Sequence, residues 1–160
     1  MKTSILLPLT ALLTTAFSSP TKVPRSMHIS MTETAFWPVT NFTCPSGSPA
    51  GCVYGFNISY TPDPADTSSF LEPAFSTFCN GTNIQGEFKP CQDPSVVTNV
   101  INGWQNSTLI VQHKWYEDLG DGSKATVWIE GNYTWVLNGT NGYQAPSSFH
   151  VKQTSQYAIA

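Results

Sequence analysis

The chain has 160 residues, of which 40% are hydrophobic, and its seven Lys and Arg against ten Asp and Glu give a formal net charge of −3. This length fits one domain better than two. The low charge offers no basic patch, which argues against a nucleic-acid partner and against electrostatic docking to a membrane.

The first residues have the pattern of a secretory signal peptide. Lys2 precedes a short apolar run, and the small residues Ala16 and Ser18 follow it. We therefore predict a signal peptide over residues 1–18, a flexible mature N-terminus over residues 19–31 and a single β-domain over residues 32–160. Because no later run has membrane-spanning length, the mature protein is expected to be secreted and extracellular.

Four cysteines, Cys44, Cys52, Cys79 and Cys91, stand in this secreted context. They predict two disulfides, for which three connectivities are possible. Pairing of sequence neighbours is the simplest, and each bridge would then contribute about 2.5–3 kcal/mol by loop-closure entropy. The spacings and the scattered histidines do not suit a zinc site.

Short β-patterns separated by turn residues fill the first half of the domain. Pro38 favours an edge position for the first strand, and residues 44–52 form a turn-rich loop between two strands. The sequence of residues 79–91, rich in Gly and Asn, predicts another loop. Residues 34–42 and 53–61 are predicted strands, residues 70–78 contain another, and residues 93–100 are ambiguous but favour a short strand.

The second half continues in the same way. Residues 107–116 alternate strongly, and residues 117–124 contain an Asp-Gly turn that predicts a hairpin. The returning strand, residues 125–130, is expected to end at Gly131, and a separate strand follows before a turn at residues 138–142. Residues 149–157 complete the chain. Since no helical period or repeat occurs, we predict an all-β fold, a compact antiparallel β-barrel or sandwich.

The strand at residues 53–60 has two unlike faces. Tyr54, Phe56, Ile58 and Tyr60 alternate with small or polar residues that include Asn57, the first residue of an Asn-x-Ser/Thr glycosylation motif. Because a glycan requires solvent, the aromatic face is predicted to be the interior. The candidate N-glycosylation sites are Asn41, Asn57, Asn80, Asn106, Asn132 and Asn138.

The order of several short motifs resembles that of a known family. "FWPVTNF", "GFNISY" and "FSTFC" follow one another, with Cys91 twelve residues after the last cysteine, and "STLIVQHKW" comes later. This order, over residues 32–135, is similar to that of the Alternaria major allergen family, secreted fungal β-barrel proteins that include allergens, elicitors and effectors. The resemblance implies pairing of Cys79 with Cys91.

The chain departs from that family's best-known member in its cysteines. No cysteine precedes Cys44 and none follows Cys91, so the N-terminal cysteine that links two protomers has no counterpart here. We therefore expect a monomer or a non-covalent dimer.

Catalytic constellations are not evident in the sequence. There is no Gly-x-Ser-x-Gly motif, and His113 alternates with apolar residues, which favours a packed or rim position over a catalytic base. Glu117, Asp118 and Asp121 lie in the predicted hairpin loop and are interpreted as turn-forming acids. We predict no enzymatic activity, no metal and no cofactor.

Among the five tryptophans, Trp128 is the best candidate for an exposed recognition aromatic. It stands out of phase with Ala125, Val127 and Ile129, whereas most of the other aromatics are expected to fill the core. The favoured function is a secreted, non-enzymatic effector-, elicitor- or allergen-like fungal protein that binds a host protein or small ligand. The alternative is a carbohydrate-binding module or a small glycan-active protein of the cell wall.

Overall fold

A computed structural model describes residues 26–29, 35–44, 52–65, 71–84, 86–103, 105–136 and 145–160. The predicted signal peptide and Asn138 lie outside these residues. The described part of the chain consists of strands, turns and coil. It contains no helix, and so none that is long and apolar enough to cross a membrane.

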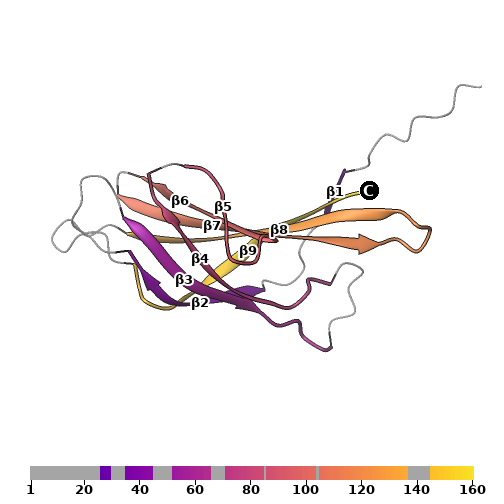
Figure 1. The fold of residues 1–160 in the computed structure, drawn as a ribbon, viewed down its shortest axis with the longest axis horizontal. Helices are drawn as coiled ribbons and strands as arrows, with labels where there is room; N and C mark the ends of the chain where they lie inside the picture. The colour runs from indigo at the N-terminus through magenta and orange to yellow at the C-terminus, as the bar shows by residue number, and fades with distance from the viewer. Residues whose placement is uncertain are drawn as a thin grey trace, which may run out of the picture.

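In the described part of the chain, nine strands form one antiparallel sheet, of which eight curl into a nearly closed barrel (Figure 1). The order across the sheet is β4-β3-β2-β9-β8-β7-β6-β5, and β1 pairs with β9 outside this path. The all-β fold class is thus confirmed. The strands are β1 (Ser26–Ile29), β2 (Phe36–Thr43), β3 (Val53–Tyr60), β4 (Phe75–Thr82), β5 (Lys89–Pro90), β6 (Val96–Asn102), β7 (Asn106–Asp118), β8 (Lys124–Val136) and β9 (Phe149–Ile159).

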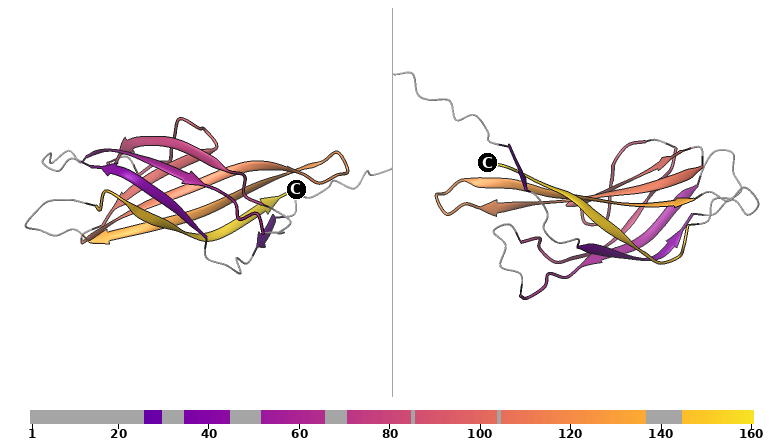
Figure 2. Two further views of the ribbon diagram at one scale, coloured as in Figure 1. Left: turned by 90° about the horizontal axis from the view of Figure 1, so that it is seen from below. Right: turned by 180° about the vertical axis from the view of Figure 1, so that it is seen from behind.

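The longest strands extend past the rest of the barrel. β7 and β8 each have 13 residues and β9 has 11, and the β7–β8 hairpin projects beyond β2, β3 and β4 (Figure 2). β1 pairs with the C-terminal part of β9, from Ser26 opposite Ile159 to Ile29 opposite Gln156. These four residues belong to the segment predicted to be a flexible mature N-terminus, and here they add a short strand to the edge of β9 beyond β2.

Two strand boundaries differ from the prediction. β4 begins at Phe75 and includes Cys79, because Val53–Tyr60 pairs with it along its whole length. The predicted break at Gly131 is wrong: β8 runs unbroken through it and shifts register against β9 there. A Cβ atom at Gly131 would lie 2.8 Å from the Lys152 carbonyl oxygen and 3.0 Å from the Trp37 ring, so the glycine allows close packing instead of ending the strand.

The barrel interior is filled largely by aromatic and branched side chains. Tyr54, Phe56 and Ile58 are buried, as the alternation in β3 predicted, and Tyr60 is half-buried at the end of the strand. Phe42 stacks on Phe56 with ring centroids 5.6 Å apart. Aromatic contacts of this kind stabilise the protein beyond the burial of their area. The interior of the barrel is therefore a packed core.

The barrel closes at a seam between β4 and β6, which lie against each other without sharing a ladder. The Cys79–Cys91 disulfide crosses this seam. Beside it, the Gln92 N–H donates to the Phe78 carbonyl (2.9 Å), and the Asp93 N–H donates to Thr77 Oγ1 (2.8 Å). A bridge between neighbours in sequence therefore joins the two edges of the sheet.

Deeper in the same seam, the Tyr54 hydroxyl lies 3.3 Å from Thr98 Oγ1, and both side chains are buried. Burial raises the pKa of Tyr54, and the hydrogen bond to Thr98 partly offsets this effect. Gly81 is required opposite Tyr54, because a Cβ atom there would collide with the phenol oxygen. The interior side of the seam is thus closed by a side-chain contact instead of backbone pairing.

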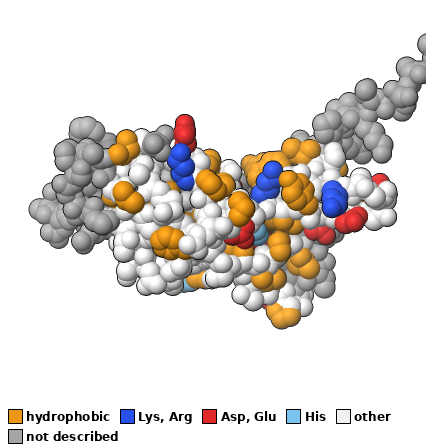
Figure 3. Space-filling model, viewed as in Figure 1, with side chains coloured by type: hydrophobic (Ala, Val, Ile, Leu, Met, Phe, Trp, Pro, Cys, Tyr) orange, Lys and Arg blue, Asp and Glu red, His pale blue; other side chains and the backbone are white. Residues whose placement is uncertain are grey.

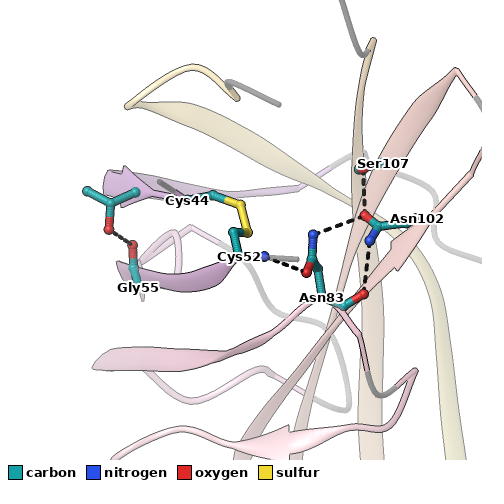
Figure 4. Close-up of a disulfide and its surroundings, with 7 residues drawn as sticks. Cys44, Cys52, Gly55, Asn83, Asn102 and Ser107 are labelled. Carbon is teal, nitrogen blue, oxygen red and sulfur yellow. Dashed lines mark hydrogen bonds between the residues drawn. A yellow bond between two sulfur atoms is a disulfide. The ribbon is translucent and has the colours of Figure 1, made fainter. Parts of the chain in front are cut away.

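Amide side chains tie the neighbouring end of the barrel, next to the Cys44–Cys52 disulfide (Figure 4). Asn83 Oδ1 accepts from the Cys52 N–H (2.8 Å), and Asn102 Nδ2 donates to the Asn83 carbonyl (3.0 Å). Ser107 donates to Asn102 Oδ1 (2.8 Å). This chain of bonds connects the start of β3, the end of β4 and the β6–β7 hairpin. Both disulfides are confirmed.

Removing the seam disulfide should destabilise the protein more than removing the other bridge. Loop-closure entropy assigns each bridge about 2.5–3 kcal/mol, since the loops are similar in length. Cys79→Ser with Cys91→Ser should exceed that value, because it also frees the bonds of Gln92 and Asp93. Urea unfolding compared with the Cys44→Ser, Cys52→Ser variant measures the difference. Equal losses in the two variants would contradict this role of the seam.

Asp93 should make the seam sensitive to acid. Hydrogen bonds from the Ser95 hydroxyl and N–H hold the pKa of Asp93 below its ordinary value, and the charge of nearby His113 adds to the effect. A lowered folded-state pKa means that the stabilisation is present above the unfolded-state pKa, about 3.9, and is lost as pH falls through the folded-state pKa.

Asp93→Asn should therefore lower the free energy of unfolding at pH 7, and the deficit should shrink as the pH falls below about 4. Chemical unfolding of the wild type and the variant between pH 7 and pH 3 provides the measurement. Ser95→Ala, which keeps the carboxylate and removes one donor, should show a smaller deficit with the same trend. A deficit that is constant with pH would argue against the Asp93 charge as its source.

Candidate functional site

An aromatic pair stands on the outside of the barrel where β8 and β9 adjoin. Trp128 of β8 and Tyr157 of β9 are partners in register, and both are half-buried. Their rings are stacked, with centroids 5.7 Å apart and an interplanar angle of 26°. The outward position of Trp128 follows from the alternation in β8, whose neighbouring residues Val127 and Ile129 are buried.

β7 extends this surface. Lys114 is opposite Trp128 in register, and its Nζ lies 5.7 Å from the ring centroid of Tyr116, whose exposed fraction is 67%. Ile159 of β9 is also exposed and lies opposite Thr126 of β8. We call Lys114, Tyr116, Trp128, Tyr157 and Ile159 the outer aromatic face.

Polar groups border the outer aromatic face along the same strands. Gln112 and Glu130 are opposite each other in β7 and β8, and Gln112 Nε2 donates to Glu130 Oε2 (2.8 Å). Ser155 of β9 is opposite Glu130. Hydrophobic side chains also reach the surface elsewhere, in separate groups (Figure 3). Scattered exposed apolar residues are ordinary in proteins, whereas adjacent aromatics in register form a continuous contact surface.

The glycosylation candidates differ in exposure. Asn41, Asn57, Asn80 and Asn106 are exposed, and Asn132 is half-buried in the middle of β8. Asn41 has φ 55° at the irregularity between β2 and β3, a left-handed conformation that Asn adopts more readily than most residues. Four of the six positions therefore have the solvent exposure that a glycan requires.

A second polar site lies inside the barrel, around a carboxylate that no sequence pattern indicated. Glu72 has an exposed fraction of 4% and belongs to the segment that leads from β3 into β4. Trp37 Nε1 donates to both of its oxygens (3.1 and 3.2 Å), and Gln153 Nε2 donates to Oε2 (2.7 Å). Its third partner is His113 Nδ1, which is 2.8 Å from Oε1.

We call Glu72, Trp37, His113 and Gln153 the carboxylate cluster. Its three nitrogen-bearing side chains come from β2, β7 and β9, which pairwise contacts in the sheet hold in place. Trp37 and Gln153 nitrogens can only donate, so an ionised Glu72 with the His113 proton on Nδ1 satisfies every contact. Burying a charge requires this degree of pairing.

Aromatic rings surround His113. The Phe75 ring centroid lies 4.4 Å from that of His113, and the Trp115 ring centroid lies at 5.4 Å. Trp37 and Phe75 also meet edge to face, with centroids 6.0 Å apart. His113 is thus packed inside the barrel, one of the two positions that the sequence favoured for it.

A carboxylate bonded to an imidazole can orient a catalytic base, but such a base must come within hydrogen-bond reach of the substrate. His113 has an exposed fraction of only 2%, and Glu72 is similarly buried. In this conformation the pair therefore acts on the fold: it anchors the β3–β4 segment to three strands of the barrel.

Glu72 has no sequence signal of its own, because a single acidic residue before a proline follows no periodic pattern. The available signal was the presence of polar residues, including His113 and Gln153, at inward positions of β7 and β9. Such residues need partners when they are buried, but the sequence cannot say which partner.

The acidic hairpin loop has structural roles. Asp118 Oδ1 accepts from the Gly120 N–H (2.9 Å), and Asp121 Oδ1 accepts from the Ser123 N–H (2.9 Å). Gly120 and Gly122 have φ of 80° and 83°, which glycine adopts without strain. Within the described ranges, no three His, Cys, Asp or Glu residues gather in a way that could hold a metal ion.

Comparisons of the chain with protein-family models, with curated proteins and with solved structures find no match.

Loss of Glu72 should cost much of the protein's stability. Glu72→Ala leaves three buried donors unpaired, so the free energy of unfolding should fall by about 3–5 kcal/mol. Glu72→Gln should cost less, since its amide keeps one acceptor oxygen. The matched control is Glu87→Ala, whose side chain is 75% exposed and which should change stability by less than about 0.5 kcal/mol. Denaturant titration of the three variants tests this ranking, and an unchanged Glu72→Ala would contradict it.

Proposed function

We propose that this protein is a secreted, non-enzymatic binding protein that engages a host protein outside the cell through its outer aromatic face. The observation that carries the proposal is the stacked pair of Trp128 and Tyr157, which lies on the exterior of the sheet instead of in the core. Trp and Tyr are the residue types most enriched at the energetic centres of protein interfaces.

The neighbours of this pair support the same reading. Tyr116 and Ile159 add exposed apolar area, and Lys114 adds a charge that can steer association. The site is on strands, so its side chains are held by the sheet and lose little freedom on binding. A non-enzymatic role agrees with the deep burial of His113 and Glu72, which keeps this acid–base pair away from a substrate.

Secretion is supported by the signal-like N-terminus and by two disulfides, which persist in oxidising compartments. The resemblance to the Alternaria family suggests the setting, an effector- or elicitor-like role of a fungal protein on a plant host. Infiltration of the purified protein into leaf tissue, combined with an extracellular pull-down, tests that setting. Absence of both a tissue response and a bound protein would count against it.

A carbohydrate-binding role is the second candidate, and the same pair favours it. Stacked aromatic side chains bordered by Gln112, Glu130 and Ser155 offer both a ring surface and hydrogen-bonding groups to a sugar. Retention of the protein on chitin, β-glucan or cellulose that depends on Trp128 would support this role and contradict a protein partner.

Trp128→Ala should weaken retention of the protein partner by at least about tenfold, because a central aromatic of an interface commonly contributes 2 kcal/mol or more. Phe88→Ala, at an exposed aromatic outside the outer aromatic face, is the matched control and should bind as the wild type does. Titration calorimetry or surface binding with the captured partner measures both. Equal effects of the two substitutions would place the interface elsewhere.

A further inference from the structure

The carboxylate cluster is asymmetric in how its members are held. Its three donors, Trp37, His113 and Gln153, belong to paired strands: Trp37 is opposite Val151, His113 is opposite Ile129, and Gln153 is opposite Gly131. Their acceptor, Glu72, belongs to residues 71–74, which are not part of any strand. The barrel therefore fixes the donors, while a connecting segment supplies the carboxylate.

The same end of the barrel holds one donor more than Glu72 uses. Trp115 Nε1 is buried and has no hydrogen-bond partner among the described residues, and the Trp115 side chain is more than nine-tenths buried. Its ring lies against that of His113, within the aromatic surroundings of the cluster. Buried donors without a partner are rare in folded proteins, and each calls for an explanation such as an acceptor that the fold itself does not supply. Trp135 Nε1 is a second such donor among the described residues, but only Trp115 lies against the ring of His113.

The chemistry of a fitting ligand follows from these side chains. Trp37, Gln153 and His113 converge on two oxygen atoms in the way that suits a carboxylate. Phe75 and Trp115 supply apolar surface beside it. A carboxylic acid with a small aliphatic or aromatic body meets both requirements, whereas a neutral molecule of the same shape lacks the charge.

The geometry points to a carboxylate-binding site at this end of the barrel, which the Glu72 carboxylate occupies in the ligand-free protein. An external carboxylate displaces Glu72 and takes its hydrogen bonds, and the segment 71–74 moves away with it. The apparent affinity of the protein for an external carboxylate is therefore reduced to the fraction of time that Glu72 leaves the site free. This inference is independent of the outer aromatic face and of any partner bound there.

Removal of the internal carboxylate should expose the site to the external one. Glu72→Ala should bind acetate, butyrate and benzoate at least about tenfold more tightly than the wild type, and its melting temperature should rise with their concentration. Titration calorimetry and thermal unfolding at constant ionic strength are the measurements. If Glu72→Ala does not fold, Glu72→Gln takes its place, because its amide binds the same donors more weakly.

Three controls define the site. Butyramide and benzamide should not stabilise Glu72→Ala, since they lack the charge. Glu87→Ala and Trp128→Ala should bind carboxylates as the wild type does, and adding Gln153→Leu to Glu72→Ala should remove the gain. In ¹H–¹⁵N spectra of the wild type and of Glu72→Ala, butyrate should shift the indole signals of Trp37 and Trp115.

Two results would overturn the inference. The first is that carboxylates stabilise Glu72→Ala no more than their amides do. The second is that the variant binds them while saturating concentrations leave the indole signals of the wild type unchanged, which would make Glu72 a permanent structural tie and not a competitor. Weak, saturable binding to the wild type, tightened by Glu72→Ala, is the supporting outcome.

Discussion

Closure of the barrel depends on the seam where β4 and β6 lie against each other without a shared ladder. Backbone ladders join the neighbouring strands along the rest of the sheet, whereas this junction is closed by side chains, by the Cys79–Cys91 bridge and by the backbone hydrogen bond from Gln92 to Phe78. If the seam opened, the phenol of Tyr54 and the apolar residues behind it would meet water. Opening the seam would therefore lose the stabilisation from burial of the whole interior, in addition to that of the disulfide.

Closure also creates the conditions for the carboxylate cluster. Side chains from β2, β7 and β9 approach one point only because the sheet curls until its inward faces oppose each other. In that dry interior, a carboxylate with three donors is stable, and the same carboxylate without them would not be. The cluster in turn fixes the segment before β4, and so it supports the strand that forms one side of the seam.

The interior and the exterior of the barrel have different roles. The interior aromatics such as Phe56 hold the fold, and their removal lowers stability. The outer aromatic face lies on the long strands β7, β8 and β9, where they continue past β2, β3 and β4 and where β1 pairs with β9. Substitution of an interior aromatic such as Phe56 should therefore affect unfolding, whereas substitution of Trp128 should affect binding of the proposed protein partner.

The sequence by itself determined the features that depend on neighbouring residues. Alternation indicated which faces of β3 and β8 point inward, and hence the outward position of Trp128, and turn residues indicated the β7–β8 hairpin. The four cysteines predicted two bridges and left three connectivities open, of which the structure has the one between sequence neighbours. Only the tertiary structure decided that Gly131 continues a strand, that residues 26–29 pair with β9 and that Glu72 meets His113 and Gln153. The contacts of Glu72 and the pairing of β1 join residues from about 40 to more than 100 positions apart in the sequence. The role of Gly131 depends on the space beside the Trp37 ring. Local sequence patterns predict neither kind of feature.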